Sequence, residues 1–201
     1  FREPQQLQAF SEELLPLLEQ KNARSRRLRI WSAGCSSGEE PYTIAMLAKE
    51  SRRFEGWDVE VYGTDISRRV LNIARRAEYG ASSLRSTSES NLARWFDEVP
   101  GGKVKVKEEI RRWVSFGHLN LFDENVARLV PRFDVIFCRN VMIYFDAAAR
   151  KRALKLFHEK LSEGGYLLLG HSESLISLSA DFELVHFKSD LVYRKPEAVK
   201  T

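Results

Sequence analysis

The chain opens with a segment whose apolar side chains recur at helical spacing. Over residues 4–22 the apolar positions recur with the period of a helix, so they share one helix face; they are Leu7, Phe10, Leu14, Leu15 and Leu18. Basic residues between Lys21 and Arg29 interrupt this pattern. The sequence therefore predicts an amphipathic helix that ends near residue 22.

Two units of strand, loop and helix follow. Their strands are predicted at residues 28–32 and 59–64, where β-branched and aromatic residues are concentrated. The first helix is predicted to begin near Glu39, and the second to cover residues 67–76. Pro41 fits the first turn of the earlier helix, because its missing N–H costs nothing there. Successive units of this kind predict a parallel sheet.

A polar stretch then breaks the alternation of strands and helices. Residues 81–102 are mostly polar, lysines alternate with valines over residues 103–107, and an apolar run follows at residues 113–116. We interpret these last two runs as short strands around residues 108–112. They predict a small antiparallel β insertion that covers about residues 84–117.

The strand and helix pattern returns in the last third of the chain. A buried strand is predicted at residues 133–138, a helix at 146–161, a further strand at 166–169, and a terminal hairpin from the runs at 182–187 and 191–194. The whole chain, residues 1–201, is therefore expected to be one α/β domain. Its sheet should be mostly parallel with an antiparallel edge at the C-terminal hairpin.

Composition narrows the class of protein. With 201 residues, 43% hydrophobic and 30% charged, the chain can bury one core, and no apolar run reaches the roughly 20 residues of a membrane span. Several arginine pairs occur along the chain, and such pairs usually lie on the solvated face of a helix. With a net charge of +4, a basic surface would also favour acidic partners, either protein or nucleic acid. With only Cys35 and Cys138 and no export signal, we expect a cytoplasmic protein.

Candidate ligand-binding residues follow the first two strands of the predicted sheet. Ligands of open parallel sheets bind at the carboxyl ends of the strands. The small residues from Gly34 to Gly38 let a ligand approach the main chain, and Glu39 stands at the helix start. Asp65 ends the second strand, where a carboxylate can accept the hydroxyl hydrogens of a ribose. Two plainer interpretations stay open: the glycines only make the turn, and Asp65 only caps the helix near Ser67.

A third polar cluster follows the strand at residues 133–138. Arg139, Asn140 and Tyr144 place a guanidinium, an amide and a phenol where a cofactor and a substrate would meet. As an alternative, polar residues at this place only cap the next helix.

Other kinds of site fit the residues less well. Ser36 stands where a Gly-x-Gly-x-x-Gly dinucleotide loop has its second glycine, and Asp65 lies too far along for the acid of that motif. No Gly-Lys-Ser or Gly-Lys-Thr follows the glycines, which excludes a triphosphate loop. The histidines lack metal-ligand spacing, so no metal site is expected.

Several motifs of the chain match one family, in that family's order. They are Phe-Arg-Glu at residues 1–3, Trp-Ser-Ala at 31–33, Ser-Ser-Gly-Glu-Glu-Pro-Tyr at 36–42, Gly-Thr-Asp-Ile at 63–66, Asn-Leu at 120–121, Phe-Cys-Arg-Asn-Val-Met-Ile-Tyr-Phe at 137–145 and Gly-His-Ser-Glu-Ser-Leu at 170–175. The chain resembles the CheR-type chemotaxis receptor methyltransferases over nearly its whole length. The resemblance implies a Rossmann-like class I methyltransferase fold with a seven-stranded sheet.

The resemblance also implies S-adenosylmethionine as the methyl donor and S-adenosylhomocysteine as the product. It implies that Asp65 binds the ribose and that the adenine lies near Asn120 and Leu121. The full set of cofactor-binding residues expected is Arg2, Ala33, Gly34, Glu39, Asp65, Ile66, Asn120, Leu121, Cys138, Arg139 and Asn140. Arg2, Arg139 and Tyr144 match the family positions closest to the reacting methyl group, and they are the expected catalytic residues.

The function implied is transfer of a methyl group to glutamate side chains on the cytoplasmic domain of a chemoreceptor. A non-catalytic cofactor-binding or signalling module on the same scaffold is the alternative. A nucleic-acid methyltransferase is not expected, because residues 139–142 do not match an Asn-Pro-Pro-Tyr-like or cysteine-nucleophile motif for a flipped base. We expect a monomer without nucleic-acid partner or membrane insertion, and a missing upstream helical domain, since the chain starts at the Phe-Arg-Glu motif.

Overall fold

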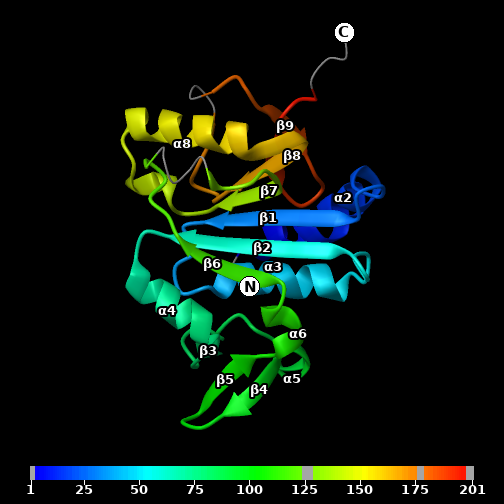
Figure 1. Ribbon diagram of the computed structural model, residues 1–201, viewed down its shortest axis with the longest axis vertical. Coiled ribbons are helices and arrows are strands. Elements are labelled where there is room, and N and C mark those ends of the chain that lie inside the picture. Colours follow the sequence, from blue (N-terminus) through cyan, green and yellow to red (C-terminus); the bar gives the residue numbers. More distant parts are fainter. Residues whose placement is uncertain (1–2, 124–128, 176–178, 198–201) are drawn as a thin grey trace.

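The protein is built around a seven-stranded sheet (Figure 1). The computed structural model describes residues 3–123, 129–175 and 179–197. The order across the sheet is β6 (Val114–His118), β2 (Asp58–Asp65), β1 (Arg27–Ala33), β7 (Phe133–Cys138), β8 (Leu161–Leu169), β10 (Leu191–Arg194) and β9 (Glu183–His186). The five strands from β6 to β8 are parallel, and β10 is antiparallel to both of its neighbours. The predicted fold class is confirmed.

Helices cover both faces of this sheet (Figure 1). One face packs against the opening helical segment and α3 (Glu39–Glu50), and the other against α8 (Ala147–Lys160). Alternation along β1 divides the core, because Ile30 belongs to the first cluster and Trp31 to the second. Trp31 also donates its indole N–H to the Thr64 hydroxyl at 2.9 Å, which ties β1 to β2.

The opening helix is continuous but has a π-helical middle. It consists of α1 (Pro4–Gln8), the π segment η1 (Ala9–Leu14) and α2 (Leu15–Lys21), and all five of its predicted apolar positions are buried. Pro16 follows the π segment and has no N–H to donate to the preceding turn. Because the five predicted apolar positions are all buried, the prediction of an amphipathic helix is confirmed.

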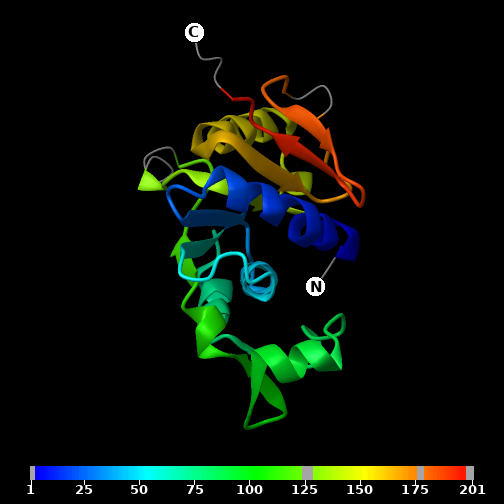
Figure 2. The same ribbon diagram turned by 90° about the vertical axis from the view of Figure 1, so that its right-hand side faces the viewer.

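The β insertion differs from its prediction. Its sheet has the order β3 (Glu78–Tyr79), β5 (Lys103–Val106) and β4 (Phe96–Val99), and β4 follows directly on α5 (Glu89–Trp95). The run at residues 113–116 was wrongly assigned to the insertion, because it belongs to β6, which pairs in parallel with β2 from Val114 to His118. An apolar run identified this strand, but such a run does not by itself name the pairing partner of a strand. Figure 2 shows the small sheet extending away from the main sheet.

The connections of the small sheet explain the error. Two short strands were expected on either side of residues 108–112, but α6 (Glu108–Arg111) forms there and leads the chain back to the main sheet. The partners of β5 lie earlier in the chain instead, in β3 and β4. Helix α4 (Arg68–Arg76) packs beside β2 and β6.

The topology brings five strand ends to one edge of the sheet. Because β6, β2, β1, β7 and β8 are parallel, their carboxyl ends gather there, at His118, Asp65, Ala33, Cys138 and Leu169. The chain winds outward in one direction from β1 through β2 to β6 and in the other through β7 to β8. Ligands of doubly wound sheets bind where the winding reverses, which here is between β1 and β7.

Candidate functional site

The loop after β1 is fixed against both neighbouring strands. The N–H groups of Gly34 and Cys35 both donate to the Thr64 carbonyl at 2.8 Å, which holds the loop to the end of β2. Gly34 has φ 81°, and a Cβ placed on it would overlap the side chain of Val141 in the segment after β7. This position needs glycine both for its backbone conformation and for the close approach. This packing agrees with the interpretation that the glycine makes the turn, and the approach of a ligand to this main chain stays a prediction.

Asp65 joins the first loop to the helix that follows β2. Its carboxylate accepts the N–H of Ser36 at 2.9 Å and that of Ser67 at 2.8 Å. The second bond is the helix-entry role that the sequence left open. An ionised carboxylate offers about four acceptor positions, so these two bonds leave acceptor capacity for ribose hydroxyls. The structure therefore makes the two interpretations of Asp65 compatible.

The segment after β6 lies beside Asp65. His118 is hydrogen bonded through Nε2 to the Ile66 carbonyl at 2.9 Å, and Leu119 donates its N–H to the Asp65 carbonyl at 3.1 Å. Asn120 is exposed, and the side chain of Ile66 is 63% exposed although it is apolar. An apolar surface with a few polar groups around it suits a planar base. The structure thus joins Asp65 and Ile66 to His118 and Leu119, directly before residues 120–121, and the role of these residues in holding an adenine stays a prediction.

Glu39 at the start of α3 points toward hydroxyl groups. Its two carboxylate oxygens accept the hydroxyl of Ser37 at 2.7 Å and that of Ser83 at 2.8 Å. Ser83 lies just beyond β3, so Glu39 connects the first loop to the insertion. The next residue, Glu40, faces the guanidinium of Arg139 instead.

A buried ionic cluster lies where β1 and β7 end. The Arg139 side chain is 6% exposed, and its Nε and Nη2 lie 3.0 and 2.8 Å from one carboxylate oxygen of Glu3. Its Nη1 lies 3.4 Å from Glu40, whose other oxygen accepts the Ser32 hydroxyl at 2.7 Å. Burial raises the pKa of Glu40, and the Arg139 charge and the Ser32 hydrogen bond oppose that shift. Two carboxylates therefore share one guanidinium.

Glu3 and Glu40 lie inside motifs of the family, and neither was predicted to have a role. Acidic residues are usual in the first turn of a helix because of its dipole, so Glu40 carried no local signal of a partner. Its partner, Arg139, directly follows β7, far along the chain, and spacing alone does not reveal that contact.

Acidic side chains gather around the first loop. Burial is the main cause that raises the pKa of the Cys35 thiol, and Asp65 and Glu40 add to it. Cys138 is fully buried, and burial likewise raises the pKa of its thiol. Both cysteines are thus neutral, enclosed groups, and neither has the lowered pKa of a nucleophile.

The segment after β7 forms the rim of the site. A 3-10 turn, η2 (Met142–Tyr144), buries Met142 and exposes the Tyr144 side chain to 82%. Asp146 accepts the Ala149 N–H at 2.7 Å and caps α8. The helix-capping alternative therefore holds for Asp146 and not for Arg139 or Tyr144. Arg2 lies outside the described residues.

Residues 1–191 of the chain match the family described as "CheR methyltransferase, SAM binding domain". The chain belongs to the CheR methyltransferase family. "Chemotaxis protein methyltransferase 2" of Vibrio cholerae is 36% identical over 202 residues, which cover 100% of this chain and 70% of that protein. The "Chemotaxis protein methyltransferase" of Borreliella burgdorferi is 41% identical over 87% of this chain and 63% of its own length. The recognition made from the motifs is confirmed.

Solved structures agree on the fold of this CheR methyltransferase domain. N-methyltransferase NodS from Bradyrhizobium japonicum WM9, in complex with S-adenosyl-l-homocysteine, has a TM-score of 0.53 at 16% identity and covers 94% of this chain and 88% of its own. A Listeria monocytogenes protein described as a class I S-adenosylmethionine-dependent methyltransferase also has a TM-score of 0.53, at 13% identity, and covers 96% of this chain and 61% of its own. These likenesses support the fold alone.

The family assignment confirms two predictions about the CheR methyltransferase chain. It is a methyltransferase, and its cofactor is S-adenosylmethionine. Among the described residues, no helix has both the length and the apolar character to cross a membrane.

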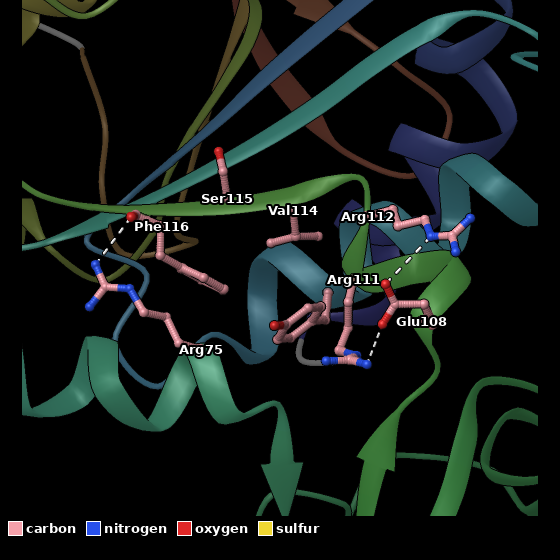
Figure 3. Close-up of a pocket in the computed structure, with 8 residues that line it drawn as sticks. Arg75, Glu108, Arg111, Arg112, Val114, Ser115 and Phe116 are labelled. Atoms are coloured by element: carbon pink, nitrogen blue, oxygen red, sulfur yellow. Dashed lines mark hydrogen bonds and ion pairs between the residues drawn. The ribbon is translucent and has the colours of Figure 1, made fainter.

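A separate cavity of about 280 Å³ lies beside the edge strand β6, away from the carboxyl ends (Figure 3). Its lining comes from α3, α4, α6 and β6, and consists of Tyr42, Arg75, Glu108, Arg111, Arg112, Val114, Ser115 and Phe116. Arg111 and Arg112 both pair with Glu108, and Arg75 donates to the Phe116 carbonyl at 3.2 Å. None of the predicted site residues lines this cavity, so we do not assign the CheR methyltransferase chemistry to it.

Proposed function

We propose that this chain is the catalytic domain of a cytoplasmic, monomeric protein-glutamate O-methyltransferase that acts on the cytoplasmic domain of a chemoreceptor. The names of its relatives support the class of substrate. The observation that carries the proposal is that the Arg139 guanidinium holds a carboxylate, that of Glu3, at the carboxyl edge of the sheet. Tyr144 stands exposed on the rim of the same edge.

The residues present fit the cofactor. Gly34 keeps the main chain close to Val141, Asp65 has acceptor capacity left, and Ile66 offers an exposed apolar surface. The carboxylates near the first loop suit a donor that carries a positive charge. S-adenosylmethionine, when bound, supplies an electrophilic methyl group on its sulfonium. Asp65 would hold its ribose, and Ile66 with Asn120 and Leu121 would hold its base.

The proposed chemistry needs no general base. A glutamate side chain has a reference pKa of about 4.3, so the substrate carboxylate is already the nucleophile at neutral pH. What the protein must supply is alignment, and fixing two reactants in line can lower the barrier by roughly 7 to 11 kcal/mol. The task of the residues after β7 is then to orient the substrate.

Arg139 is the residue that suits this task. In the structure its Nε and Nη2 both face one Glu3 oxygen, and a substrate carboxylate would exchange with Glu3 for the same N–H groups. The contact with Glu40 keeps the guanidinium in place during such an exchange. Charge is neutralised as the methyl group is transferred, so we assign Arg139 to orientation and not to quenching of charge.

Two measurements test the proposal. The first is calorimetric titration with S-adenosylhomocysteine of the wild type and of Asp65→Asn, which keeps one acceptor oxygen for the N–H groups. We expect micromolar binding that weakens at least tenfold in the variant. Asp97→Asn, on the exposed strand β4, is the matched control and should bind as the wild type does.

The second measurement uses a chemoreceptor cytoplasmic domain and methyl-labelled donor. Transfer should give label that alkali releases as methanol, because esters hydrolyse in base and N-methyl groups do not. Binding of S-adenosylhomocysteine without any transfer would favour the non-catalytic module, and alkali-stable label would exclude a glutamate ester.

A further inference from the structure

One carboxylate gathers the main chain of two neighbouring loops. Glu173, in the turn after β8, accepts the N–H groups of Asn140 and Gly170 on one oxygen, both at 2.9 Å. Its other oxygen accepts those of Val141 at 3.1 Å and Ile143 at 3.2 Å. Four main-chain donors thus converge on one side chain, and three of them belong to the segment that carries the candidate methyl-transfer residues.

The backbone of that segment has the form of an anion-binding concavity. Asn140 has φ 57°, in the left-handed region, and Val141 follows with φ −113° and ψ −49°, in the right-handed region. Successive N–H groups in such alternating conformations point to one side and bind an anion. A left-handed residue other than glycine costs energy and persists where its surroundings hold it. The Glu173 carboxylate is the anion that occupies this concavity.

The turn after β8 is shaped to deliver the carboxylate. Glu173 donates its own N–H to the Gly170 carbonyl at 2.8 Å, which closes a tight turn. A Cβ on Gly170 would come within 3.0 Å of atoms of Asn140 and of the Glu173 carboxylate. The absence of a side chain at Gly170 therefore lets the ends of β7 and β8 approach each other.

We propose that Glu173 is a positioning residue: its carboxylate fixes the main chain of residues 140–143 and thereby sets where Arg139 and Tyr144 stand for methyl transfer. Arg139 lies directly before the concavity and Tyr144 directly after it. This role rests on the proposed function for its effect on turnover. The hydrogen bonds that hold the main chain of residues 140–143 to Glu173, which we call the clamp, are a property of the fold.

The test compares Glu173→Gln with Glu183→Gln. The amide introduced by Glu173→Gln would keep the shape of the glutamate side chain but turn an N–H₂ group toward two N–H donors. Glu183, at the exposed start of β9, is the matched control. We expect amide hydrogen exchange at Asn140, Val141 and Ile143 to speed up at least tenfold in Glu173→Gln only. Unchanged exchange at these amides would overturn the clamp.

Turnover separates positioning from general support of the fold. At a temperature well below unfolding, we expect kcat of Glu173→Gln to fall at least tenfold, while the Kd for S-adenosylhomocysteine stays within threefold of the wild type. Glu173→Asp keeps the charge with a shorter reach and should recover part of kcat. A kcat equal to that of an active wild type, or equal losses in kcat and in cofactor affinity, would overturn the positioning role. If the wild type transfers no methyl group, the proposed function fails, and amide exchange still decides on the clamp.

Discussion

The candidate site has two halves that are built differently. We call Gly34, Asp65, Ile66, Asn120 and Leu121 the nucleoside half, and Glu3, Glu40, Arg139 and Glu173 the arginine half. The nucleoside half is held by hydrogen bonds between adjacent strands, and Ile66 and Asn120 are open to solvent. The arginine half joins four distant parts of the chain, and its guanidinium is almost fully buried.

The difference teaches how each half should respond to change. A buried charge is tolerated only with its partners, so removal of one member leaves the others desolvated and unpaired. A hydrogen bond at an exposed loop can be replaced by water at modest cost. We therefore expect substitutions in the arginine half to reduce stability and turnover together, and most substitutions in the nucleoside half to reduce cofactor affinity first.

The largest effect is expected at Arg139. Its replacement by leucine removes the cation shared by Glu3 and Glu40 and should lower the free energy of unfolding by about 3 to 5 kcal/mol in urea denaturation. Arg27→Leu is the matched control, because the pair of Arg27 with Asp58 is just as short at 2.8 Å but more than half exposed. That change should cost about 1 kcal/mol or less. Equal losses in the two variants would contradict the contrast between buried and exposed pairs.

A smaller effect is expected at Gly34, which packs against Val141 in the main chain that Glu173 holds. In Gly34→Ala the new methyl group would overlap Val141, and such overpacking typically costs about 1 to 3 kcal/mol. Gly101→Ala isolates the backbone cost, because Gly101 has φ 86° and open space around it. The double variant Gly34→Ala with Val141→Ala should regain part of the stability and of the S-adenosylhomocysteine affinity. Equal losses at Gly34 and Gly101 would show that the close packing of Gly34 against Val141 adds nothing to the backbone cost.

The same contrast explains what the sequence could predict. The nucleoside half follows from order along the chain, because residues just after parallel strands must meet at one edge, and both Gly34 and Asp65 were found by that argument. The arginine half depends on the partner of each charge, and Glu3, Glu40 and Glu173 were quoted in motifs without a role. The misplaced strand at residues 113–116 has a similar cause, since a pattern identifies a strand but not its neighbour. Local signals therefore predicted the elements, and long-range pairing had to come from the structure.

The smallest effect is a pH dependence that singles out Glu40. Burial raises its pKa above the ordinary value of 4.5, with Glu3 and Glu173 adding to the shift and Arg139 and Ser32 opposing it. The folded protein then holds the Glu40 proton more tightly than the unfolded chain does. The stabilisation from this group is complete below the unfolded pKa and is lost as pH rises through the folded pKa.

Glu40→Gln cannot ionise at this position, so it should lack that part of the pH dependence. We expect the free energy of unfolding of the wild type to fall relative to that of Glu40→Gln as the pH rises above 4.5, as measured by urea denaturation of both proteins at each pH. Other titrating groups are common to the two proteins and largely cancel in the difference. A difference that stays constant over this range, or that grows in favour of the wild type, would mean that Arg139 and Ser32 outweigh burial. In that case Glu40 would be an ionised partner of Arg139 throughout, and the arginine half would be held by a full ion pair on each side of the guanidinium.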